Sequence, residues 1–109
     1  MNSESLEEIL YSIKNSKLSL ILASTKDCGV CTSIEPRVKN LIRKYPNINY
    51  KHIFIDSMIR ASGEFTIFTV PTIIIFAEDK EIHRESRFID FQKLNFEITR
   101  WYDYLFNFQ

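Results

Sequence analysis

The residues best suited to do chemistry are two cysteines three positions apart, in the segment Cys28-Gly29-Val30-Cys31. An apolar run over residues 18–23 precedes them and helical spacing follows, so a helix is predicted to begin at Cys28. The free amide N–H groups and positive dipole end of a helix N-terminus favour a thiolate at Cys28. Cys31 lies one turn further along, where it can act as the resolving thiol. The pair therefore indicates dithiol–disulfide exchange, with attack on a substrate disulfide, a mixed disulfide, and release by internal attack.

Other uses of such a pair are weaker. A Cys-x-x-Cys pair is also half of a four-ligand zinc site, which needs a second pair of cysteine or histidine ligands. The two histidines, His52 and His83, are isolated and not at ligand spacing, so no metal site is predicted. A purely structural disulfide is disfavoured because linking residues three apart removes little entropy from the unfolded chain. Two buried, inert cysteines remain an open alternative.

Composition suits a single domain over residues 1–109, because 45% of the 109 residues are hydrophobic. Fourteen basic and fourteen acidic residues give a net charge of zero, so neither nucleic acid nor an anionic membrane is an expected partner. The polar N-terminus lacks a secretory pattern, and the apolar stretch from Val70 to Ala77 is too short to span a bilayer. We expect a cytoplasmic monomer. In the cytoplasm a cysteine pair is more often catalytic than structural.

Hydrophobic periodicity and end signals predict an alternation of helices and strands. Ser5 and Glu8 fit a capping box at the start of the first helix, and Pro36 lies inside the helix that follows the cysteines. The expected segments are a helix over 6–13, a strand over 18–23, a helix from 28, a strand over 50–56, a short helix over 57–65, strands over 72–77 and 81–88, and a final helix from 90. The first two strands form a parallel βαβ unit, and the last two form an antiparallel hairpin.

With these residues in place, the chain resembles the thioredoxin family. The resemblance rests on the cysteine segment 28–31, on Pro36, on Asp56 after the second strand, and on Thr69-Val70-Pro71-Thr72 before the apolar strand. It extends over nearly the whole chain. It implies an α/β thioredoxin fold, a four-stranded mixed sheet flanked by helices in the order αβαβαββα.

The resemblance also implies roles for individual residues. Cys28 is expected to be the nucleophile and Cys31 the resolving thiol. Pro71 is expected in the cis form, which would place the Val70 backbone beside the sulfurs to pair with an extended substrate. Gly29 and Val30 are expected to help dock that substrate. No bound cofactor is implied, since electrons would come from a thioredoxin reductase or a low-molecular-weight thiol.

Two departures from the family flank the sulfurs. Asp27 stands where the family usually has tryptophan, and an acidic neighbour disfavours a thiolate. Val30 replaces the common proline and frees a backbone N–H near the sulfurs, which favours a thiolate and makes a weaker reductant. These effects oppose each other, so the direction of the shift in reduction potential stays open.

A third departure concerns the resolving step. Leu22 stands where the family buries an aspartate that assists proton removal from the second thiol, which predicts slower resolution of the mixed disulfide. His52 falls near a position that carries lysine in many relatives and is a candidate for that proton transfer. The alternative for His52 is an ordinary packing or surface role. Arg87 stands near a position where glycine is frequent in the family, which bears on the shape of the docking groove.

The sequence therefore predicts a thiol–disulfide oxidoreductase that reduces protein disulfides and serves cell redox homeostasis and electron transport. Its partners would be disulfide-bearing proteins. Two alternatives use the same fold: a binding or scaffold module with an incidental dithiol, and an oxidant or isomerase. The last differs from the reductase only in reduction potential.

Overall fold

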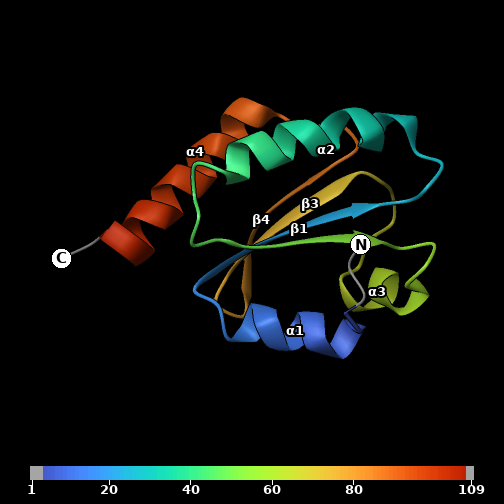
Figure 1. Ribbon diagram of the computed structural model, residues 1–109, viewed down its shortest axis with the longest axis horizontal. Helices are drawn as coiled ribbons and strands as arrows, with labels where there is room; N and C mark the ends of the chain where they lie inside the picture. Colours follow the sequence, from blue (N-terminus) through green and yellow to red (C-terminus); the bar gives the residue numbers. More distant parts are fainter. Residues whose placement is uncertain (1–3, 108–109) are drawn as a thin grey trace.

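The computed structural model describes residues 4–107, in which a four-stranded sheet lies between two layers of helices (Figure 1). The elements follow the predicted order. They are α1 (Leu6–Lys14), β1 (Leu18–Ser24), α2 (Gly29–Ile42), β2 (Asn49–Phe54), α3 (Ile59–Glu64), β3 (Thr72–Ala77), β4 (Lys80–Ser86) and α4 (Phe91–Tyr102), with a π-helical turn over Asp103–Asn107.

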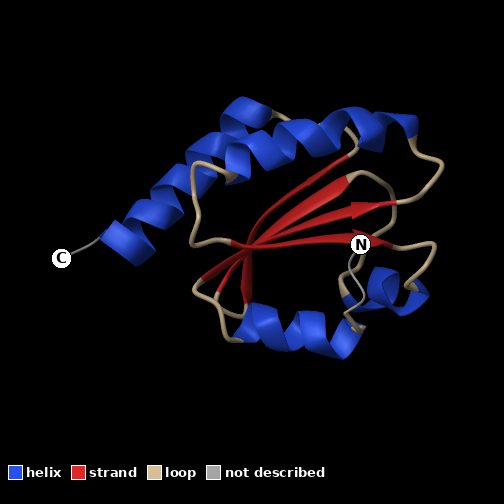
Figure 2. Cartoon of the chain, viewed as in Figure 1, coloured by secondary structure: helices blue, strands red, loops and turns tan. Residues whose placement is uncertain are grey.

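The sheet is mixed, as predicted, with the strand order β2-β1-β3-β4 (Figure 2). Strand β1 pairs in parallel with β2 and antiparallel with β3, and β3 pairs antiparallel with β4. Every residue of β1 is buried. A strand that is buried on both faces has a continuous apolar sequence, and β1 could therefore be predicted from its residues.

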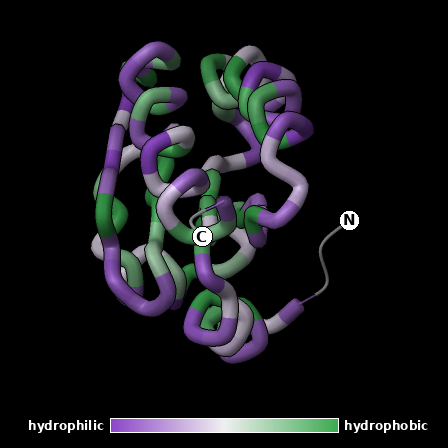
Figure 3. Tube along the Cα trace, turned by 90° about the vertical axis from the view of Figure 1, so that its left-hand side faces the viewer, coloured by the Kyte–Doolittle hydropathy of each residue, from purple (hydrophilic) through white to green (hydrophobic). Residues whose placement is uncertain are grey.

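Two helical layers cover the two faces of the sheet. Helices α2 and α4 lie on one face, and α1 and α3 lie on the other (Figure 1). The first layer buries aliphatic residues that include Leu22, Val38 and Ile75, and the second buries another group that includes Ile9 and Ile74. In Figure 3 the turns of the helices alternate between hydrophobic and hydrophilic colours, as expected when only one side of each helix packs on the sheet.

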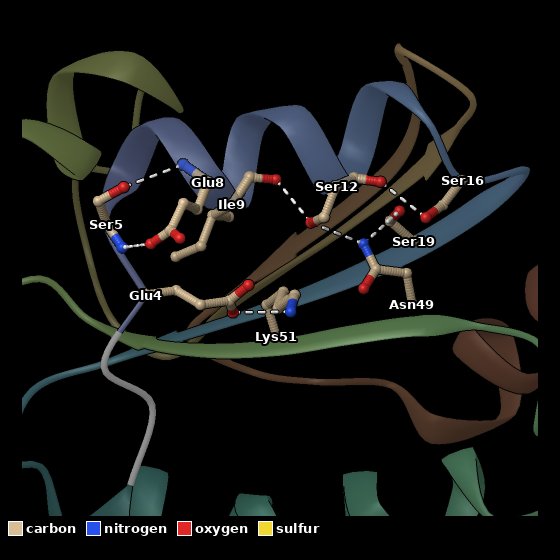
Figure 4. Close-up of polar contacts among 9 residues, drawn as sticks. All are labelled: Glu4, Ser5, Glu8, Ile9, Ser12, Ser16, Ser19, Asn49 and Lys51. Carbon is tan, nitrogen blue, oxygen red and sulfur yellow. Dashed lines mark hydrogen bonds and ion pairs between the residues drawn. The ribbon is translucent and has the colours of Figure 1, made fainter.

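Helix α1 is tied to the edge strand β2 by polar contacts (Figure 4). The predicted capping box is present, since the Glu8 N–H donates to Ser5 Oγ and the Ser5 N–H donates to Glu8 Oε1. From β2, Asn49 Nδ2 donates to Ser12 Oγ at 3.0 Å and to Ser19 Oγ at 3.2 Å. These bonds help hold β2 in register beside β1, and β2 carries His52.

Some segment boundaries differ from the prediction. Strand β2 ends at Phe54 because the Ser57 and Met58 N–H groups both donate to the Phe54 carbonyl and start a turn. Strand β4 covers Lys80–Ser86 rather than residues 81–88, because residues 78 and 87 both have a positive φ and bend the chain at either end. Across residues 4–107, no helix is long and apolar enough to cross a membrane.

Candidate functional site

Cys28 and Cys31 form a disulfide at the start of α2, with 5.2 Å between their Cα atoms. Cys28 is the N-cap of the helix, and Cys31 lies inside its first turn. Cys28 is half-buried, whereas only 4% of Cys31 is exposed. An external thiol or disulfide therefore reaches the sulfur of Cys28 more readily than that of Cys31.

The helix N-terminus directs hydrogen-bond donors at Cys28. The Cys31 N–H donates to Cys28 Sγ at 3.1 Å, and the Thr32 N–H donates to the Cys28 carbonyl at 3.2 Å. When the disulfide is reduced, a donor so placed stabilises a thiolate more than a thiol, and the helix dipole acts in the same direction. The electrostatics expected from the sequence are thus built into the first turn of α2.

The loop before β3 lies at the same end of the sheet. The Val70–Pro71 peptide bond is cis, which confirms the expectation from the family resemblance. Thr72, the first residue of β3, pairs with Ala23 near the end of β1, and α2 begins shortly after that strand. The Pro71 carbonyl accepts a 2.7 Å hydrogen bond from the Arg87 N–H. The loop is therefore anchored to both neighbouring strands.

Exposed apolar side chains flank this end of the molecule. Val30 is 57% exposed, Phe68 90% and Phe88 86%. Phe68 lies two residues before Val70, and Phe88 follows the residue that binds Pro71. Neither phenylalanine was predicted as a site residue from the sequence. The sequence pattern that could have identified them is an aromatic residue beside each turn at this end of the sheet. Such a pattern does not distinguish an exposed aromatic side chain from one in the core.

Behind the disulfide is a small pocket of about 120 Å³. Cys31 contributes to its wall, and so do polar side chains from β1, α2 and β2. The lining residues are Ser24, Thr25, Lys26, Cys31, Thr32, Glu35, His52 and Phe54. The pocket thus brings Cys31 together with His52, the histidine that the sequence suggested for proton transfer.

His52 is held by hydrogen bonds from two other elements. Its Nδ1 lies 3.1 Å from Glu35 Oε2 in α2, and its Nε2 lies 3.0 Å from Ser24 Oγ at the end of β1. The Phe54 ring packs beside it, with 4.5 Å between ring centroids. Burial lowers the pKa of His52 below its ordinary value, although the neighbouring Glu35 opposes that change. The neutral imidazole is therefore the form favoured at pH 7.

Glu35 supplies the negative charge beside this imidazole. Burial works to raise the pKa of Glu35, but Lys39 and His52 outweigh it and hold that pKa below its ordinary value. An ionised Glu35 accepts the Nδ1–H of neutral His52, which leaves Nε2 to accept from the Ser24 hydroxyl. Glu35 and Ser24 were not predicted as site residues from the sequence. Glu35 follows Cys31 by four positions, which puts both on one face of α2.

Leu22 is fully buried and pairs in register with His52, so the neighbour of His52 on β1 is an apolar side chain. Asp56 fixes the nearby chain instead, because its Oδ2 accepts the Lys26 N–H at 3.1 Å. Among residues 4–107 there is no group of three or more histidine, cysteine or acidic side chains able to hold a metal ion.

A cysteine pair that closes at the N-terminus of α2, beside a cis-proline loop, defines a thioredoxin-fold protein with a redox-active disulfide. A family model described as Thioredoxin matches residues 1–99, and the chain belongs to the thioredoxin family. Proteins of this family are in general thiol–disulfide oxidoreductases.

Individual relatives agree with the family match. The chain is 36% identical over 98 residues to the thioredoxin-like protein YdfQ of Bacillus subtilis (strain 168), which is 90% of this chain and 88% of that protein. Thioredoxin from Fasciola hepatica superposes with a TM-score of 0.74 at 26% identity, over 87% of this chain and 89% of that one. Oxidised mitochondrial thioredoxin 3 of Saccharomyces cerevisiae has a TM-score of 0.77 at 21% identity over 88% and 90%, which shows the shared fold.

Proposed function

We propose that this protein reduces disulfides in protein substrates by dithiol exchange, with Cys28 as the nucleophile and Cys31 as the resolving thiol. The observation that supports this most directly is the asymmetry of the pair. Cys28 is half-buried and accepts the Cys31 N–H, whereas Cys31 is 4% exposed. A sulfur that is both reachable and stabilised as a thiolate is the one that attacks first.

The exchange balances in two steps. The Cys28 thiolate attacks one sulfur of the substrate disulfide, forms a mixed disulfide and releases the first substrate thiolate. Cys31 then loses its proton and attacks Cys28 Sγ, which releases the second substrate thiolate and closes the Cys28–Cys31 disulfide. Two electrons pass from the dithiol to the substrate. An external thiol or reductase restores the dithiol afterwards.

The substrate would dock as an extended segment on the Val70 backbone. No hydrogen bond engages the N–H or C=O of Val70 within residues 4–107, so both groups are available to an added strand. A Cβ placed on Gly29 would meet no atom within 4 Å, so the space beside Cys28 is open. Pro71 shapes the loop, and Val30, Phe68 and Phe88 would give apolar contacts to side chains of the substrate.

The electron source would be a thioredoxin reductase or a low-molecular-weight thiol, and the protein would work in the cytoplasm without a bound cofactor. A cytoplasmic reductant needs a Cys28–Cys31 potential near or below the glutathione poise, about −220 to −260 mV by biochemical extraction. The opposed changes at Asp27 and Val30 make this potential the property to measure first.

A trapping experiment tests the roles of the two cysteines. The Cys31→Ser variant should accumulate a mixed disulfide with a protein substrate through Cys28, seen as a mass increase that thiol reductants remove. The Cys28→Ser variant is the matched control and should trap little. Multiple-turnover reduction of an insulin disulfide should be lost in both variants. Equal trapping by both variants would overturn the assignment of Cys28 as the nucleophile.

Equilibration with glutathione redox buffers, read by thiol alkylation, separates the remaining functions. A potential near thioredoxin's, about −270 mV, supports a reductase, and one near −120 to −180 mV would indicate an oxidant or isomerase. A binding module would form no reversible disulfide and would keep its partner in a double variant, Cys28→Ser with Cys31→Ser.

A further inference from the structure

The pocket behind the disulfide brings together three groups that the sequence keeps apart: Ser24 of β1, Glu35 of α2 and His52 of β2. Cys31 is also part of its wall, so the resolving thiol and the imidazole share one small space of about 120 Å³. Such a volume holds only a few water molecules. A water in this pocket can therefore connect Cys31 and His52.

We propose that His52 accepts the proton of Cys31 across this pocket during resolution of the mixed disulfide, and that Glu35 is the residue that positions and charges the imidazole for this step. The inference rests on the proposed dithiol exchange and concerns its second half. The Cys31 thiol gives its proton to the Ser24 hydroxyl oxygen, directly or through a water in the pocket, as Ser24 passes its own proton to His52 Nε2. The Cys31 thiolate attacks Cys28 Sγ, the Cys28–substrate bond breaks, and the imidazolium later returns its proton to the leaving thiolate or to water.

The hydrogen bonds set the imidazole in the tautomer that this step needs. Glu35 Oε2 accepts from Nδ1, so the lone pair of Nε2 points to the Ser24 hydroxyl at the wall of the pocket. An ionised carboxylate at Nδ1 also stabilises the imidazolium that forms. Burial lowers the pKa of His52 and Glu35 opposes that change, so the imidazole is neutral at pH 7 before the proton arrives.

The other ionisable groups around His52 do not replace it as the base. Lys39 of α2 pairs with Glu35 at 3.3 Å, and Lys26 lines the pocket from the loop after β1. A lysine ammonium has three hydrogen-bond donors and no acceptor. Tyr50 lies two residues before His52 on β2, and burial together with Glu35 raises its pKa above its ordinary value of 10. Asp56 is engaged by the Lys26 N–H. His52 is therefore the neutral base among the ionisable side chains that line the pocket with Cys31, where Glu35 is the ionised partner of the imidazole.

The chain contains its own control. His83 lies on β4 and contacts Glu85 Oε2 at 2.7 Å, with an exposed side-chain fraction of 14% against 15% for His52. His83 is not among the residues that line the pocket. His83→Gln thus removes a histidine with the same burial and a carboxylate partner but leaves the pocket intact.

Stopped-flow reaction of the reduced protein with excess 5,5′-dithiobis(2-nitrobenzoate) separates the two halves of the exchange. The first release of coloured thiolate depends on reagent concentration and reports attack by Cys28. The second is independent of concentration and reports resolution by Cys31.

At pH 7 we expect His52→Gln to slow the second phase by about 10-fold to 100-fold, at or just below the usual range for a general base. Glu35→Gln should slow it by about 3-fold to 10-fold, and His83→Gln by less than about twofold. The first phase should stay within about twofold in all three variants.

The pH profile of the second phase distinguishes a proton acceptor from a structural residue. The wild-type rate should rise with the deprotonation of His52 and then level off. In His52→Gln it should rise about tenfold per pH unit toward the ordinary thiol pKa near 8.5.

Glu35→Gln removes the charge that raises the pKa of His52, so the rise of the second-phase rate should occur at lower pH in this variant. Glu35→Gln also provides the test if His52→Gln does not fold. An unchanged rate and profile in both variants would overturn the inference. Absence of any second phase in the wild type would instead overturn the proposed dithiol exchange.

Discussion

His52 and His83 lie on opposite edge strands of the sheet, β2 and β4, and each contacts a glutamate. His52 pairs in register with Leu22 and His83 with Ile75, two members of the same buried cluster under α2 and α4. The two histidines thus share a face of the sheet, a degree of burial and a partner type. They differ in what surrounds each histidine–glutamate pair.

The His83–Glu85 pair makes its contacts within β4 and with the start of α4. Glu85 follows His83 by two residues on the same strand, and its second oxygen accepts the Asp90 N–H at 2.6 Å. Asp90 is the N-cap of α4. The pair on β2 instead links two elements through Glu35 and faces the pocket with Cys31. The two histidines therefore differ in their neighbours in space, although they share residue type and burial.

The largest expected effect is on stability and compares the apolar residues that pair with the two histidines, Leu22 and Ile75. Replacing either Leu22 or Ile75 with aspartate should lower the free energy of unfolding by about 3–5 kcal/mol, because each change leaves a cavity and buries a carboxylate. Urea denaturation of the oxidised proteins measures both losses. A loss below about 1 kcal/mol for Leu22→Asp alone would show that the surroundings of His52 accept a buried acid. The apolar surroundings of the two histidines would then not be equivalent.

A smaller effect separates the two carboxylates by stability. Glu85→Ala should lower the free energy of unfolding by about 2 kcal/mol, since it removes charge-assisted bonds to His83 and to the Asp90 N–H. Glu35→Ala should cost less than about 1 kcal/mol, because the Glu35 side chain is 33% exposed and paired at the surface. Thermal or urea unfolding gives both values. Equal losses would make the β2 pair a structural element like its counterpart.

The smallest effect is a pH dependence of stability. Because burial lowers the pKa of His52 in the folded state below its ordinary value of 6.5, the unfolded chain binds more protons between those two values. The free energy of unfolding should therefore fall as pH drops through 6.5 and level off below the folded pKa. Unfolding curves between pH 5 and 8 measure this slope. It should be smaller in His52→Gln than in His83→Gln, which retains His52, and equal slopes would contradict the assignment.

The fold could be predicted from the sequence because its signals are local or belong to a recognisable pattern. The apolar run of β1, the capping box at Ser5 and the helix start at Cys28 depend only on neighbouring residues. The cis Pro71 followed from the family resemblance. Strand ends were less predictable, since the end of β4 depends on Arg87, a non-glycine residue with φ of 69°.

The candidate site was predictable only in part. Cys28 and Cys31 were evident because they are close in sequence, whereas Glu35 and Ser24 carried no separate signal. From the sequence alone, a packing or surface role for His52 was favoured over proton transfer, and nothing in its local pattern distinguishes it from His83. The contacts with Glu35 and Ser24 favour the proton-transfer role.

By itself the sequence determined the order of the elements, the position of the dithiol at a helix N-terminus and the class of chemistry, because periodicity, capping and spacing act over a few residues. Only the tertiary structure decided which groups surround Cys31. Ser24, Glu35 and His52 come from three elements, and they meet because β2 pairs in parallel with β1 in one register while α2 packs across that face. A shift of one residue in that register would turn His52 to the opposite face and separate it from Cys31.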